Sequence, residues 1–120
     1  MKSKTLVVGA SENPERYANK AANRLLQQGH AVELLGSREG TVRGNPIRTG
    51  QPELDDIDTV TLYVSASNQT ELYEYIKSLK PRRVIFNPGT ENPAFEKELE
   101  QQGIKPIEAC TLVMLATGQY

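Results

Sequence analysis

Short apolar runs alternate along this chain with longer stretches in which apolar residues recur every three or four positions. The short runs are typical of strands buried on both faces of a parallel sheet, and the longer spacing indicates helices with one apolar face. The pattern predicts strands at about 4–9, 31–35, 59–64, 83–86 and 104–107, and helices at about 14–28, 69–79, 93–102 and 111–117. We therefore expect one domain, residues 1–120, with an α/β fold: a Rossmann-like, doubly wound, parallel five-stranded sheet in a three-layer αβα arrangement.

The first helix and residues 40–58 carry additional local signals. In the first helix, Asn13-Pro14 is predicted to form the N-cap and first turn, with Ser11 as the alternative cap. Tyr17, Ala21 and Leu25 are spaced to form one stripe toward the sheet. Residues 40–58 are rich in glycine and proline and are predicted to be loop, with a short extended piece around 41–43.

Charge and composition argue against several classes of protein. The formal net charge is −1 and the charges are dispersed, which argues against nucleic-acid binding and against a membrane surface. The apolar run Leu6–Ala10 is too short for a signal-peptide core, and a single cysteine fits a reducing compartment. We expect a cytoplasmic protein, and the sequence leaves a homodimer open.

The first strand ends in Gly9-Ala10-Ser11, and a polar turn then leads into the helix expected at about 14–28. Gly9 allows a sharp turn and a close approach of the backbone to a ligand. The helix that follows offers unpaired amides and the positive end of its dipole to an anion. This junction therefore predicts a phosphate-binding loop, although small residues also make tight turns without any ligand.

The residues after strand two discriminate between nucleotides. Ser37-Arg38 stands where an NAD site has an acidic residue. An arginine there favours a phosphorylated ribose, as in NADP or coenzyme A, while a solvated surface arginine remains an alternative. Gly9 stands alone where NADP sites have three spaced glycines, which argues against a hydride-transferring enzyme. Arg16 is placed to reach a pyrophosphate, and Tyr17 to pack on a ligand or in the core.

No arrangement of residues indicates catalysis. His30 follows the glycine that ends the first helix, far from the expected cleft, and Cys110 is expected to be a buried, inert thiol. The serines of the loops have no base beside them in the sequence. We expect a binding module rather than an enzyme, and no metal site.

The chain resembles the small stand-alone CoA-binding proteins, which are similar to the CoA-binding N-terminal domain of the succinyl-CoA synthetase alpha subunit. Val7-Val-Gly-Ala-Ser11, Arg16-Tyr-Ala18 and Gly29-His-Ala-Val32 carry this resemblance, which spans essentially the whole chain. Leu34-Leu-Gly-Ser37 and Ile85-Phe-Asn-Pro-Gly89 depart from the segments that the family usually has after strands two and four.

The resemblance implies non-catalytic binding of coenzyme A or an acyl-CoA. Ala10, Ser11 and Arg16 would hold the pyrophosphate, and Ser37 and Arg38 the 3′-phosphate or adenine end. The pantetheine arm would follow Ser65, Asn68, Gly89 and Thr90.

Two alternatives stay open. One is a small enzyme that uses NADP or another nucleotide. The other is a degenerate Rossmann domain used for protein interaction through the apolar stretch Leu112–Leu115.

Overall fold

The structure is a computed structural model that describes residues 4–120. Its strands are β1 (Lys4–Val8), β2 (Ala31–Leu35), β3 (Gly40–Val42), β4 (Asn45–Arg48), β5 (Ile57–Leu62), β6 (Arg83–Phe86) and β7 (Lys105–Glu108). Its helices are α1 (Tyr17–Gln27), α2 (Ala66–Gln69), the 3-10 helix η1 (Thr70–Leu72), α3 (Tyr73–Leu79), α4 (Pro93–Gln101) and α5 (Thr111–Ala116).

All seven strands form one sheet in the order β3-β4-β2-β1-β5-β6-β7. Every neighbouring pair is parallel except β3 with β4. The α/β, Rossmann-like class predicted from the sequence is confirmed. The strand order reverses at β1, which has β2 on one side and β5 on the other, so the carboxyl ends of these three strands surround the switch point.

The prediction of five strands was wrong, because the segment expected to be loop contains a hairpin. Val42 pairs with Asn45 across the two-residue turn Arg43-Gly44, in which both residues have positive φ, 49° and 80°. Such a turn matches the right-handed twist of a hairpin. The second strand of the hairpin then adds to β2 in parallel. The short extended piece expected around 41–43 corresponds to β3.

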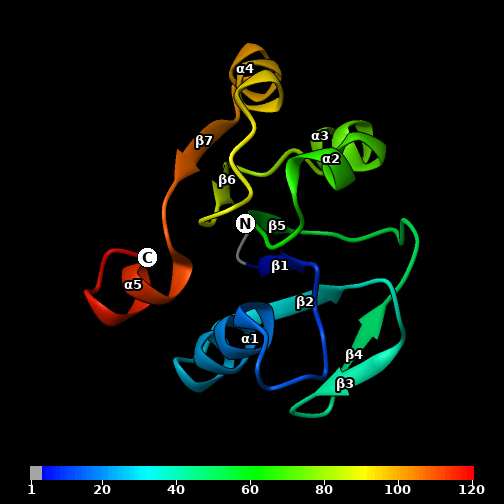
Figure 1. The fold of residues 1–120 in the computed structure, drawn as a ribbon, viewed down its shortest axis with the longest axis vertical. Helices are drawn as coiled ribbons and strands as arrows, with labels where there is room; N and C mark the ends of the chain where they lie inside the picture. Colours follow the sequence, from blue (N-terminus) through cyan, green and yellow to red (C-terminus); the bar gives the residue numbers. More distant parts are fainter. Residues whose placement is uncertain (1–3) are drawn as a thin grey trace.

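The helices cover both faces of the sheet (Figure 1). Leu6 and Val8 point to the face packed by α3 and α4, whereas Val7 points to the face packed by α1 and α5. This alternation explains why β1 is apolar throughout. Ala21 and Leu25 of α1 are fully buried as predicted, but Tyr17 is 67% exposed and does not join their stripe.

Two helix starts also differ from the prediction. The N-cap of α1 is Arg16, and neither Ser11 nor Asn13 caps the helix. Residues 13–16 instead form a turn, in which the Arg16 amide donates to the Asn13 carbonyl at 3.0 Å. The helix expected at 69–79 begins earlier, as α2, and η1 interrupts it. Among residues 4–120, no helix has the length and apolar character that crossing a bilayer requires.

Candidate functional site

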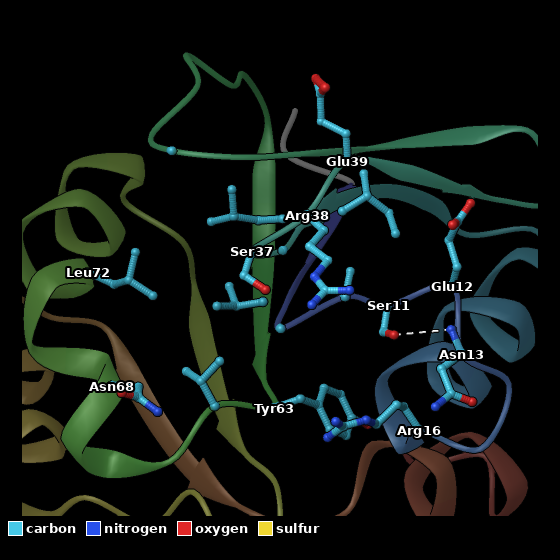
Figure 2. Close-up of a pocket in the computed structure, with 18 of the residues that line it drawn as sticks. Ser11, Glu12, Asn13, Arg16, Ser37, Arg38, Glu39, Tyr63, Asn68 and Leu72 are labelled. Atoms are coloured by element: carbon cyan, nitrogen blue, oxygen red, sulfur yellow. Dashed lines mark hydrogen bonds between the residues drawn. The ribbon is translucent and has the colours of Figure 1, made fainter.

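A pocket of about 850 Å³ opens at the carboxyl ends of β1, β2 and β5 (Figure 2). Its walls come from the loop after each of these strands, together with Ile47 of β4, Gly50 and Gln51 before β5, Asn68 of α2, and Glu71 and Leu72 of η1. Seven of the residues predicted for a ligand site line it: Gly9, Ala10, Ser11, Arg16, Ser37, Arg38 and Asn68. The topology thus brings together residues that lie far apart in the sequence.

The loop from β1 to α1 lies tightly against the end of β2. The Gly9 and Ala10 amides both donate to the Leu35 carbonyl, at 2.8 and 2.9 Å. A Cβ added at Gly36 would lie 2.5 Å from the Ala10 carbonyl oxygen, so only glycine fits there without a shift. The Ala10 amide is therefore already bonded rather than available to a phosphate, which corrects its expected role. Within the described chain, the Ser11 amide has no such acceptor.

Gly9 has a φ of +93°, a conformation that side chains rarely adopt. A Cβ at this position would also lie 3.0 Å from the Tyr63 carbonyl oxygen. Gly9 is therefore required where the loop passes between the ends of β2 and β5, and not only because a ligand comes near.

Arg16 and Arg38 enter the pocket from different elements, and Figure 2 shows both side chains directed into it. Both residues are exposed, and in residues 4–120 neither has a carboxylate partner at ion-pair distance. An unpaired guanidinium offers a fork of donors that matches phosphate oxygens. The pocket therefore has two cationic groups free to bind an anion.

Four predicted site residues lie outside this lining: Tyr17, Ser65, Gly89 and Thr90. Thr90 is only 5% exposed, and its hydroxyl donates to the Asn87 carbonyl at 2.8 Å. The Gly89 amide donates to Glu91 Oε1, and the Ser65 hydroxyl accepts from Asn68 Nδ2 at 3.1 Å. Tyr17 contacts the ammonium of Lys20 on the outer surface of α1. In the loop after β6, Gly89 and Thr90 thus form hydrogen bonds within the loop and do not line the pocket.

A buried polar cluster joins β5, β6 and α5 next to the pocket. Asn87 Nδ2 donates to Thr61 Oγ1 at 2.7 Å and to the Leu62 carbonyl at 2.9 Å, and Asn87 Oδ1 accepts from the Thr111 amide at 2.8 Å. The Thr61 and Thr111 hydroxyls bond to each other at 2.8 Å. The side chain of Asn87 therefore ties the end of β6 to the end of β5 and to the start of α5.

Tyr63 lines the pocket beside this cluster and was not predicted as a site residue. Its hydroxyl is buried without a hydrogen-bond partner in the described part of the chain. Burial raises the pKa of Tyr63 to about 12, because the phenolate would be poorly solvated there. Glu12, Gln51 and Leu72 are further lining residues that sequence reasoning missed. No local sequence signal identifies these three residues as site residues. They reach the pocket through the packing of β3, β4 and η1, which the sequence pattern did not predict.

Residues considered for catalysis do not meet at the pocket. His30 packs its ring against Tyr120, with the centroids 5.1 Å apart. Cys110 is half-buried rather than fully buried, and it lies at the start of α5 outside the pocket lining. The described residues contain no group of three or more histidine, cysteine or acidic side chains that could hold a metal ion.

The comparison with family models matches residues 3–116 to the CoA binding domain. The chain belongs to this family. The comparison with curated proteins gave no match. The resemblance to small stand-alone CoA-binding proteins is thus confirmed at the level of the family.

Several solved structures have the same fold as this chain. The crystal structure of an uncharacterized protein is 48% identical, with a TM-score of 0.96, and the match covers 100% of this chain and 99% of that one. A hypothetical protein from Pyrococcus horikoshii OT3 is 25% identical, with a TM-score of 0.87 and coverage of 97% and 83%. A protein from Thermus thermophilus, 23% identical with a TM-score of 0.84 and coverage of 98% and 91%, shows the same fold.

The apolar stretch Leu112–Leu115, considered above as an interaction surface, is divided between two environments. Met114 and Leu115 are buried against the protein's own core, whereas Val113 is 55% exposed. Half of this stretch therefore serves the packing of the CoA-binding domain itself.

Proposed function

We propose that this protein binds coenzyme A or an acyl-CoA in the pocket at the ends of β1, β2 and β5, without catalysing a reaction there. The observation that carries the proposal is the convergence on one pocket of Arg16 and Arg38, which have no carboxylate partner among residues 4–120, in a member of the CoA binding domain family. The pocket's volume of about 850 Å³ lies within the range of small-molecule sites.

The roles of individual residues follow from their positions. Arg16 is the N-cap of α1, and the Ser11 carbonyl accepts a hydrogen bond from Asn19 Nδ2 in the first turn of that helix, at 2.9 Å. The Ser11 amide and Arg16 would bind the pyrophosphate with the help of the helix N-terminus. Ser37 and Arg38 follow β2, where the ribose phosphate is expected, and Asn68 lies on the far side. Gly9 and Gly36 keep the floor of the pocket free of side chains.

Calorimetric titration with CoA, dephospho-CoA, acetyl-CoA and NADP tests this function. We expect Arg38→Ala to weaken CoA binding by about tenfold or more, since a charge-assisted hydrogen bond contributes about 1.5–3 kcal/mol. Dephospho-CoA, which lacks the 3′-phosphate, should be affected far less. Arg24→Ala is the matched control, because Arg24 is exposed on α1 and lies outside the pocket.

Equal losses for CoA and dephospho-CoA would refute the role of Arg38. A preference for NADP would favour the nucleotide-dependent enzyme instead. Absence of binding to all four ligands would refute the proposed function.

A further inference from the structure

The charges around the pocket pose a problem for any anionic ligand. Two arginines line it, but so do three carboxylates, those of Glu12, Glu39 and Glu71. Like charges disfavour binding unless they are held apart from the ligand. Figure 2 shows the carboxylates of Glu12 and Glu39 at the rim, turned away from the guanidinium of Arg38. Glu12 matters most, because it follows Ser11 directly in the proposed phosphate-binding loop.

Glu12 has a specific partner outside the pocket. Its Oε2 accepts a hydrogen bond from the backbone amide of Thr41 in β3, at 2.8 Å. Thr41 faces Pro46 in the β3–β4 hairpin, and the pair Val42–Asn45 flanks the turn, so the Thr41 amide points away from β4. An outward amide at a sheet edge is a good donor for a carboxylate. The hairpin thus supplies a fixed binding point for the Glu12 charge.

Gly40 makes room for this contact. A Cβ added to Gly40 would lie 2.4 Å from Glu12 Cδ, 2.6 Å from Cγ and 2.8 Å from Oε2. The backbone of Gly40 does not have a positive φ, so an alanine meets no conformational obstacle there. The side chain of Glu12, which packs against the Cα of residue 40, therefore explains why this position is a glycine.

We propose that Glu12 is a positioning residue for anion binding. Its hydrogen bond from the Thr41 amide, with the side chain lying over Gly40, is called the clamp below. The clamp keeps the Glu12 charge at the rim, away from a bound anion, and fixes the loop that carries Ser11. This inference rests on the proposed function, since it concerns the same pocket. It assigns the β3–β4 hairpin a role in that function, as the element that holds Glu12 aside.

Gly40→Ala tests the clamp, because the new methyl group displaces a flexible side chain and not the backbone. We expect the displaced Glu12 carboxylate to weaken CoA binding by about tenfold, as one added charge a few ångströms from several phosphate charges would. Glu12→Gln keeps a hydrogen-bond acceptor for Thr41 and removes the charge, so its affinity should equal or exceed that of the unaltered chain. In the double variant, the loss caused by Gly40→Ala should shrink to less than about twofold.

Gly103→Ala is the matched control. Gly103 follows α4, outside the pocket lining, and its φ of +76° means that alanine there strains the backbone without touching the site. It should lower the unfolding temperature and leave the CoA affinity unchanged. Unfolding temperatures of all variants separate a loss of fold from a loss of binding. The NMR chemical shift of the Thr41 amide should change between the unaltered chain and Gly40→Ala, which reports the hydrogen bond from Thr41 to Glu12 without any ligand.

The outcomes distinguish the two proposals. If the unaltered chain binds CoA and folded Gly40→Ala binds it equally well, the role of Glu12 is overturned and the function stands. If the loss persists in full in the Glu12→Gln background, the charge of Glu12 is not its cause and the inference is likewise overturned. If the unaltered chain does not bind CoA, the proposed function itself fails.

Discussion

Replacing Asn87 with alanine should destabilise the protein more than its small change in volume suggests. Asn87 is 2% exposed and makes three hydrogen bonds of 2.7–2.9 Å, to Thr61, Leu62 and Thr111. In the Asn87→Ala variant, these groups lose a partner at a place that water does not reach. Each such loss costs about 1–3 kcal/mol, and the Thr61 hydroxyl keeps its bond to the Thr111 hydroxyl. We therefore expect a total in the lower part of the summed range, about 3–5 kcal/mol. That is a large part of the stability of about 5–15 kcal/mol that is usual for a single domain.

Urea denaturation followed by far-ultraviolet circular dichroism measures this loss as a difference in the free energy of unfolding. Asn45→Ala is the matched control. Asn45 is half-buried, and its side chain makes longer bonds, of 3.3 and 3.2 Å, to the carbonyls of Val42 and Arg43. We expect the control to cost less than about 1 kcal/mol. A loss below about 1 kcal/mol for Asn87→Ala would show that the cluster does not hold the ends of β5 and β6 and the start of α5 together.

Two more substitutions probe the pocket floor. Gly36→Ala should cost about 1–3 kcal/mol in urea denaturation, because its Cβ would meet the backbone oxygen of Ala10 at 2.5 Å and nothing there gives way easily; an unchanged stability would contradict the close fit of the loop. Tyr63→Phe should cost less than about 1 kcal/mol at pH 7, since the hydroxyl has no hydrogen-bond partner among residues 4–120. The pKa of Tyr63, about 12, lies above the ordinary value of 10.0, so its contribution to stability is complete below pH 10 and is lost as the pH rises toward 12. Tyr63→Phe should therefore reduce the alkaline loss of stability by about 1–2 kcal/mol, and an identical pH profile would refute this.

The parallel part of the sheet was predictable because its strands carry an unambiguous signal. Runs such as Leu6–Val8 and Val84–Phe86 are apolar throughout, and each is followed by glycine or asparagine and then by helical spacing. The β3–β4 hairpin was not predictable in the same way. Its strands are short, Pro46 lies within one of them, and its turn requires a positive φ at Arg43, a residue that does not favour that conformation.

The candidate site was likewise predictable only in part. Gly9, Ser11 and Arg38 could be selected because each lies just after a strand, where the fold places ligands. Thr90 was selected by the same rule and lies outside the pocket, because its hydroxyl bonds to its own loop and its carbonyl accepts from Gln69 Nε2 at 2.7 Å. Position after a strand therefore identifies candidates, and tertiary hydrogen bonds decide which of them face the pocket.

The outward amide of Thr41 also bears on association between sheets. β3 and β7 are the two edge strands, and an edge with free amides invites pairing with another chain. At one edge, Glu12 already accepts the bond that an incoming strand would need. At the other, Pro106 has no amide to donate, and Lys105 and Glu108 place charges at the ends of the strand. Each edge is thus closed to strand addition by a different means, and releasing Glu12 would expose a site of edge-to-edge aggregation.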